Sequence, residues 1–126
     1  MGNFLYTREH EWIQMVDGNE ALVGISDYAQ EQLGEVVFVE LPEIGTSVAS
    51  GEDVSVIESV KAAGDLKAPV TGEIIAVNDK LNDEPELLNS DPLQEGWIYR
   101  LRVDDLAELD LLMDADAYKE FTESLE

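Results

Sequence analysis

The chain has 126 residues and a formal net charge of −22 at pH 7, from 29 acidic residues against 7 Lys and Arg. This charge argues against nucleic acid and anionic membranes as partners, because both are bound through clustered Lys and Arg. No cysteine is present, which excludes disulfides and thiolate zinc sites. Hydrophobic residues make up 44% of the chain, which is typical of a folded globular protein. The length of 126 residues predicts one domain over residues 1–126.

No apolar run reaches the roughly 20 residues that a membrane-spanning helix requires. The first residues show no signal or transit pattern. We therefore expect a soluble, monomeric, cytoplasmic protein; a mitochondrial-matrix location would require that a transit peptide has been removed.

The first part of the chain predicts a hairpin followed by a short helix. Residues 4–16 form a β-region whose apolar residues do not alternate cleanly, and Asp17-Gly18-Asn19 predicts a turn into a returning strand at 20–25. Ser26 is a favourable N-cap for a helix over residues 27–33, which the following glycine would end.

The middle of the chain contains a short internal repeat. Residues 34–39 read G-E-V-V-F-V and residues 72–77 read G-E-I-I-A-V. Each predicts a strand, and the pair predicts two similar strand–loop units on either side of a central hairpin.

The last third of the chain changes from turns to strand to helix. Residues 78–92 are polar and turn-rich, and residues 96–103 alternate as a strand. From 104 to 126 the spacing is helical through Leu106, Leu109 and Met113, with Asp114 capping a last helix. On that helix, Tyr118, Phe121 and Leu125 would share one packed side.

Between the two repeats, residues 53–72 predict a β-hairpin that presents a lysine. Apolar strands lead in and out, and Gly64-Asp65 is suited to a tight turn because Gly tolerates positive φ and Asp caps locally. Lys61 lies at the expected exposed tip among small residues. An exposed lysine amine is a good acceptor for acylation.

Five segments together resemble the glycine cleavage system H protein family over nearly the whole chain: Y-T-R-E-H-E-W, G-I-S-D-Y-A-Q-E-Q-L-G-E-V-V-F-V-E-L-P-E-I-G, E-S-V-K-A, A-P-V-T-G-E-I and N-S-D-P-L-Q-E-G-W. The resemblance implies a mainly β fold, a lipoyl/biotinyl-carrier-like β-sandwich or flattened barrel with short helices. Gly64 and Lys67 depart from the commoner family pattern, and Lys67 places a second lysine near Lys61.

What the resemblance implies is a carrier and not an enzyme, with lipoic acid joined covalently to Lys61. Its partners would be glycine decarboxylase (a pyridoxal-phosphate enzyme), aminomethyltransferase and dihydrolipoamide dehydrogenase, and a lipoate ligase or a lipoyl/octanoyl transferase would load it. Lipoyl-Lys61 would carry an aminomethyl group from the decarboxylase to the transferase. Glu11 and Asp65 are the implied contacts of the loaded, cationic arm; otherwise they are a surface acid and a turn cap.

Two other functions stay open for the same fold. One is a lipoyl donor that relays the cofactor to other enzymes, and the other is a biotinyl carrier. Biotinyl segments usually place methionines beside the lysine, whereas Val60 and Ala62 flank Lys61 here.

The remaining candidate residues indicate structure rather than chemistry. His10 is the only histidine, and without a nucleophile motif beside it we expect a half-buried structural residue. Asp114-Ala115-Asp116 begins like a calcium-binding loop but lacks the later oxygen ligand and Gly, so we predict no metal site. We expect Trp12 and Trp97 in the core.

Overall fold

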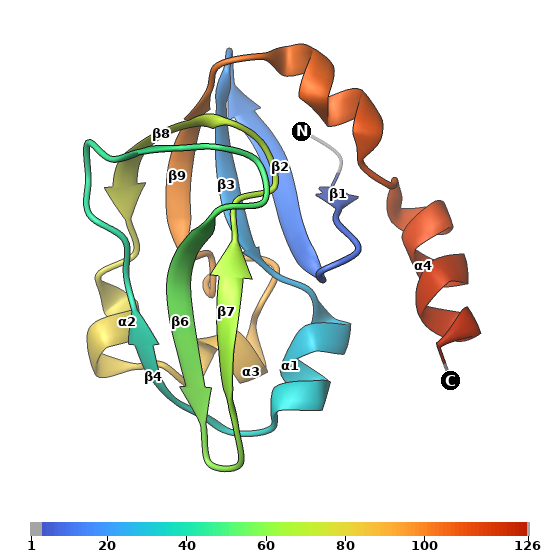
Figure 1. Cartoon of the computed structure of the whole chain (residues 1–126). Helices are drawn as coiled ribbons and strands as arrows, with labels where there is room; N and C mark the ends of the chain where they lie inside the picture. The colour runs from blue at the N-terminus through green and yellow to red at the C-terminus, as the bar shows by residue number, and fades with distance from the viewer. Residues whose placement is uncertain (1–3, 126) are drawn as a thin grey trace.

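The strands of this protein form two antiparallel sheets with the hydrophobic core between them (Figure 1). The computed structural model describes residues 4–125. The larger sheet has the order β1-β2-β3-β9-β8-β5, with bounds Phe4–Tyr6, Glu11–Asp17, Glu20–Ile25, Tyr99–Val103, Gly72–Val77 and Ser47–Val48. The smaller sheet has the order β4-β6-β7, with bounds Val36–Glu40, Asp53–Ser59 and Ala63–Lys67. The predicted mainly β sandwich is confirmed.

Short helices connect these strands and end the chain. They are α1 (Asp27–Leu33), α2 (Lys80–Asp83), α3 (Leu87–Ser90), the 3-10 helix η1 (Leu106–Leu111) and α4 (Ala115–Ser124). Within residues 4–125, no helix has the length and apolarity needed to cross a membrane. The two copies of the repeat fall in different sheets, one in β4 and one in β8.

The N-terminal β-region is two strands and not one, which corrects the prediction for residues 4–16. β1 pairs antiparallel with β2, placing Tyr6 opposite Trp12. The Thr7 hydroxyl oxygen accepts the backbone N–H groups of Glu9 and Glu11, each at 3.2 Å, and this local bonding reverses the chain. The predicted hairpin with the returning strand is confirmed, since β2 pairs antiparallel with β3.

Helix α1 begins and ends where its sequence predicts. Ser26 is the N-cap, and its hydroxyl accepts the Ala29 backbone N–H at 3.1 Å. Gly34 ends the helix with φ +78°, a conformation that favours glycine. The two ends of α1 therefore fix where it packs beside the central hairpin.

The predicted turn at Gly64-Asp65 is wrong. Both residues lie inside β7, opposite Ile57 and Val56 of β6. A turn at 64–65 would shift the register and move Leu66, now 2% exposed, away from the core. Burial of the alternating apolar residues therefore decides the register, and the chain reverses earlier, around Lys61.

The C-terminal region is helical in two separate pieces. The predicted helical spacing through Met113 is broken, because Met113 exchanges backbone hydrogen bonds with Tyr6 across an isolated bridge. Asp114 caps α4 as predicted, accepting the Ala117 N–H at 2.8 Å. Leu125 is 50% exposed and does not share the packed side of α4. Glu126 lies outside the described residues.

An aromatic cluster holds α4 against the larger sheet. The Tyr118 ring stacks on the Tyr6 ring with 4.3 Å between centroids. Trp12 is fully buried, as predicted, and its Nε1–H donates to the Pro92 carbonyl at 2.9 Å. Trp97 is half-buried and packs against the same cluster. The last helix is thereby joined to the strand that begins the fold.

We predict that Gly72→Ala destabilises the fold by about 2 kcal/mol or more, because the added Cβ would overlap the Arg102 backbone carbonyl across the β8–β9 ladder. Gly64→Ala is the matched strand control, since its Cβ would meet only Leu33 Cδ2 at 3.7 Å. Urea unfolding followed by tryptophan fluorescence measures both changes. Equal midpoints for the two variants would contradict the packing argument.

Candidate functional site

The β6–β7 hairpin presents Lys61 in a two-residue turn. Ser59 and Ala62 flank the turn: the Ser59 N–H donates to the Ala62 carbonyl at 2.7 Å, and the Ser59 hydroxyl oxygen accepts the Ala62 N–H at 3.1 Å. The Val60 N–H donates to the Glu35 carbonyl at 3.0 Å, which ties the turn to the residue before β4. The turn is thus held by a serine side chain and a neighbouring strand, and it protrudes at one end of the molecule (Figure 1).

The Lys61 side chain is exposed, and its Nζ makes no hydrogen bond or ion pair within residues 4–125. Its stem lies over Gly34, where an added Cβ would be 3.1 Å from Lys61 Cε. The other lysines lie in regular elements. Lys67 in β7 pairs with Asp53 at 2.7 Å, Lys80 in α2 pairs with Glu95 at 3.5 Å, and Lys119 lies in α4. Lys61 is therefore the lysine that a turn, rather than a helix or strand, presents to an acylating enzyme.

A cleft of about 330 Å³ opens between α1 and β7, and we call it the α1–β7 cleft. Its apolar wall comes from both elements and from β3 and β6, and acidic residues and His10 line its other side; the lining residues are Glu9, His10, Glu11, Ile25, Tyr28, Ala29, Gln32, Leu33, Ile57, Gly64, Asp65 and Leu66. Gly64 lies three residues after Lys61 in the same hairpin, and the Lys61 stem lies over Gly34, which follows the lining residue Leu33, so the cleft lies near Lys61. Along β7 the cleft extends by roughly 10 Å. The structure thus brings Glu11 and Asp65, far apart in sequence, to one cleft.

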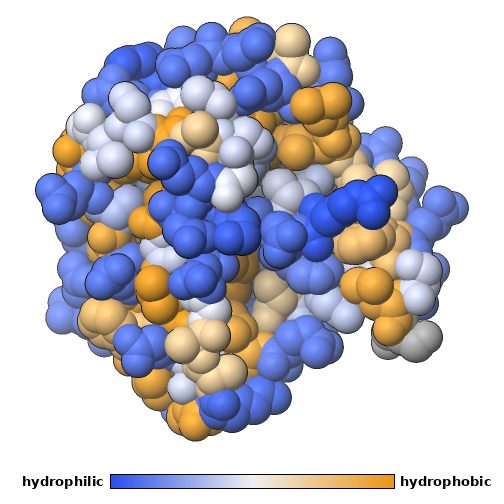
Figure 2. Space-filling view, viewed as in Figure 1, coloured by the Kyte–Doolittle hydropathy of each residue, from blue (hydrophilic) through white to orange (hydrophobic). Residues whose placement is uncertain are grey.

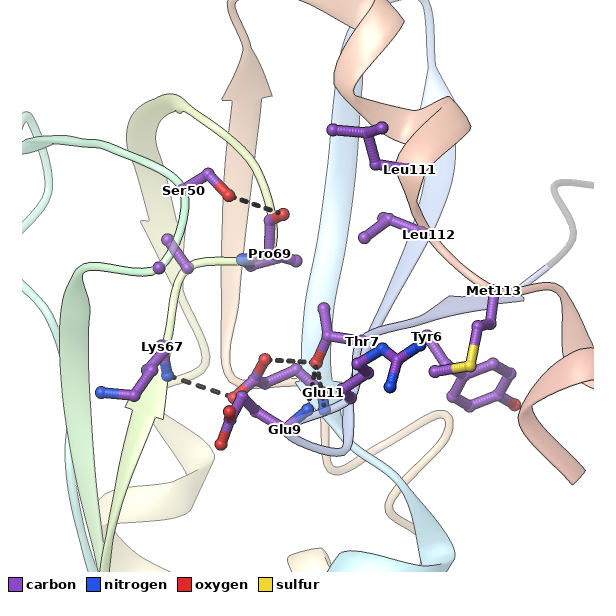
Figure 3. A pocket seen from close by; sticks show the side chains of 13 residues that line it. Tyr6, Thr7, Glu9, Glu11, Ser50, Lys67, Pro69, Leu111, Leu112 and Met113 are labelled. Carbon is purple, nitrogen blue, oxygen red and sulfur yellow. Dashed lines mark hydrogen bonds between the residues drawn. The ribbon is translucent and has the colours of Figure 1, made fainter. Parts of the chain in front are cut away.

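Glu11 is buried rather than a surface acid, with 2% of its surface exposed. The Thr7 hydroxyl donates to Oε1 at 2.6 Å, and the Lys67 backbone N–H donates to Oε2 at 3.3 Å (Figure 3). Burial raises the pKa of Glu11, while the bonds from Thr7 and Lys67 oppose that rise. Glu11 also lines a second pocket of about 370 Å³ on its other side, where Lys67 and Leu112 are neighbours.

Asp65 has the opposite environment. It is exposed in β7, opposite Val56, so the alternative role as a turn cap is wrong. Glu9, also exposed, lines the same cleft. The cleft therefore combines one buried carboxylate with two exposed ones, beside an apolar wall.

His10 is half-buried, as predicted, and joins the cleft to the C-terminal helix. Its Nδ1 lies 2.7 Å from the Tyr118 hydroxyl, which lies 2.6 Å from the Ser26 hydroxyl. The Ser26 hydroxyl oxygen also accepts the Ala29 N–H, so one serine both caps α1 and contacts Tyr118.

Sequence reasoning did not find this chain of hydroxyls. Ser26 was identifiable as a helix cap and Tyr118 as a packed helix residue, but their contact spans 92 positions. His10 itself has φ +72°, an uncommon conformation for a non-glycine residue. No local pattern predicts a turn geometry that aims one imidazole at a distant helix.

One protein family and its members match nearly the whole chain. A sequence model described as "Glycine cleavage H-protein" matches residues 4–125. A glycine cleavage system H protein of Thermus thermophilus is 56% identical over 119 residues, covering 94% of this chain and 92% of that protein. The protein of the same name from Parvibaculum lavamentivorans is 51% identical over 126 residues and covers 100% of both.

A solved structure agrees with the sequence relatives. The crystal structure of a glycine cleavage system H protein from Mycobacterium marinum superposes with a TM-score of 0.87 at 37% identity, covering 98% of each chain.

We predict that the His10 pKa lies below its ordinary value of 6.5, because burial opposes the charged form and outweighs the nearby Glu9 charge. The unfolded chain then takes up this proton at higher pH than the folded protein, so the free energy of unfolding should fall as pH is lowered from about 6.5 through the folded pKa. NMR titration of the single imidazole measures the pKa directly. Urea midpoints are then measured against pH for wild type and His10→Gln. The difference between the two curves separates the contribution of His10 to the free energy of unfolding from that of the carboxylates.

The variant Tyr118→Phe tests the hydroxyl chain within the same titration. It removes the hydroxyl that lies 2.7 Å from Nδ1. A Tyr118 hydroxyl that donates to Nδ1 stabilises the neutral imidazole, so its removal should raise the His10 pKa. Tyr28→Phe is the control, since the Tyr28 ring contacts the His10 ring in a tilted arrangement with 4.6 Å between centroids, and the variant keeps that ring. A His10 pKa that falls or stays unchanged in Tyr118→Phe would show that Tyr118 does not donate to Nδ1.

Proposed function

The chain belongs to the glycine cleavage H-protein family, and on that basis we propose that it carries lipoate as an amide on Lys61 and shuttles an aminomethyl group between the enzymes of glycine cleavage. One observation supports Lys61 above the other lysines: it lies in an exposed turn with an unpaired Nζ, beside the opening of the α1–β7 cleft.

The residues around Lys61 fit a lipoyl group in shape and chemistry. An acyl arm on Nζ would start over Gly34 and meet Leu33 and Gly64, the first residues of the cleft wall. The apolar side chains Ile57 and Leu66 would shelter the arm from water. Bound lipoate would supply the dithiol that accepts and releases the one-carbon amine.

In this proposal the acidic side of the cleft holds the cationic end of a loaded arm. Glu11 and Asp65 would face the amine from two sides, the first from a buried position where electrostatic interactions are stronger. A neighbouring cation would in turn favour ionised Glu11 against the burial that raises its pKa. An uncharged arm gains nothing from these acids, so it would be free to leave the cleft.

The partners follow from the same proposal. Glycine decarboxylase, aminomethyltransferase and dihydrolipoamide dehydrogenase would act in turn on the arm, and a lipoate ligase or lipoyl/octanoyl transferase would attach it. The net charge of −22 would draw basic docking surfaces on these enzymes. A glycine-dependent assay with the partner enzymes separates the shuttle from a lipoyl donor, and intact mass separates lipoyl from biotinyl forms.

We predict that Lys61→Arg gains no lipoyl mass when incubated with the attaching enzyme, because the guanidinium keeps the charge but removes the acylatable amine. Its urea midpoint should match that of wild type, since the Lys61 side chain is exposed. Lys67→Arg is the control and should be modified like wild type. Modification of Lys61→Arg at Lys67, located by peptide mass, would contradict the assignment.

We predict that Asp65→Asn and Glu11→Gln both accept lipoate but lose the aminomethyl group to water faster than wild type. A charge-assisted hydrogen bond contributes roughly 1.5–3 kcal/mol, so Glu11→Gln should release the aminomethyl group about tenfold faster than wild type. The increase in release rate for Asp65→Asn should be smaller, because Asp65 is exposed and solvent screens its charge. The measurement is ammonia and formaldehyde release from the loaded protein without its partners.

Asp79→Asn serves as the control for this release assay, because Asp79 is exposed and does not line the α1–β7 cleft. Equal release rates for wild type, Asp65→Asn and Glu11→Gln would show that neither acid holds the arm.

A further inference from the structure

A β-bulge in β4 places two large apolar side chains on the surface. Val36 pairs with Ser59 and Phe38 with Glu58, so Val37 is an extra residue on β4. Val37 and Phe38 are 50% and 49% exposed, between buried Val36 and Val39. A regular strand would alternate and turn one of the two inward. The bulge instead aims both outward, which is a common use of bulges near functional sites.

These side chains lie next to the lysine turn. Val60, 66% exposed, precedes Lys61, and its N–H bonds the Glu35 carbonyl two residues before Val37. Strand spacing places Val37 and Phe38 within roughly 10 Å of the turn. We call Val37, Phe38 and Val60 the bulge patch. Figure 2 shows hydrophobic surface at this end of the molecule, beside hydrophilic side chains.

Charge around the bulge patch restricts what can cover it. Glu35, Glu40 and Glu58 are exposed beside it, and residues 9–60 contain no Lys or Arg. A second copy of this chain, with the same acidic surface and a net charge of −22, would be repelled. The fitting partner has an apolar depression flanked by Lys or Arg.

The position of Lys61 indicates which enzyme with a basic surface contacts the bulge patch. An enzyme that acylates the bare Nζ must approach within the length of one lysine side chain, so its surface must cover the residues beside the turn. Enzymes that act later on the end of a long acyl arm can stand further away. Only the attaching enzyme is therefore required by geometry to contact the bulge patch.

We propose that Val37, Phe38 and Val60 form the docking surface for the enzyme that attaches lipoate to Lys61, which meets them with an apolar depression flanked by basic side chains. This inference rests on the proposed function, because it takes Lys61 as the attachment site. In that step the Nζ–acyl bond forms while the bond between the acyl carbon and its activating group breaks, and the amine loses a proton.

The test compares lipoate attachment to unmodified wild type and to the double variant Val37→Thr/Phe38→Thr. Threonine preserves β-propensity while removing most of the apolar surface. The KM for the carrier should rise about tenfold with kcat nearly unchanged, since central apolar contacts contribute most to such interfaces. Attachment is followed by intact mass, using the purified attaching enzyme and its activated acyl donor. The urea midpoint should stay at the wild-type value because both side chains are already half exposed.

The matched control is Val16→Thr/Leu111→Thr, which removes two exposed apolar side chains, 41% and 84% exposed, from β2 and η1, elements that contribute nothing to the bulge patch. It should leave KM unchanged. Equal KM values for the two double variants would overturn the docking surface. Normal attachment with impaired glycine turnover would assign the patch to a later enzyme and would also overturn it. Failure of wild type itself to gain lipoate would instead contradict the proposed function.

Discussion

The candidate site depends on the hydrogen bonds that the buried Glu11 carboxylate accepts. It joins the β1–β2 turn, through the Thr7 hydroxyl, to the smaller sheet, through the Lys67 backbone N–H. Without it, two polar groups at the junction of the sheets would lose their partner, and buried unpaired groups are costly. The same carboxylate separates two pockets, so the interaction that joins the sheets also supplies the acidic side of the α1–β7 cleft.

The cleft is assembled from the whole length of the chain. Its acidic side comes from the β1–β2 turn, the start of β2 and Asp65 of β7, and its apolar wall from α1, β3, β6 and β7. Tyr118 of α4 supports it from outside. Because Tyr118 bonds both His10 and Ser26, the last helix holds the cleft residue and the cap of α1 at once. A short C-terminal helix with one buried residue can thereby influence a site it does not line.

The end of the molecule that presents Lys61 is organised differently from the cleft. Hydrogen bonds from Ser59 and to Glu35 fix the backbone of the turn, while the Lys61 side chain stays exposed. The bulge beside it exposes apolar side chains that regular alternation would turn inward. The proposed function requires access for an attaching enzyme and shelter for the attached group. The bulge patch adjoins β6 of the hairpin and the α1–β7 cleft adjoins β7.

The sequence by itself determined the β-rich class, the capped helix α1, the last helix after Asp114 and the exposed position of Lys61, because each depends on local capping, alternation or composition. It did not determine where the hairpin turns, since Gly64-Asp65 has good turn chemistry but burial of Leu66 selects another register. It also could not show that Glu11 is buried or that Tyr118 reaches His10. These contacts join residues 56 and 108 positions apart, and only the packing of the two sheets and α4 brings such residues together.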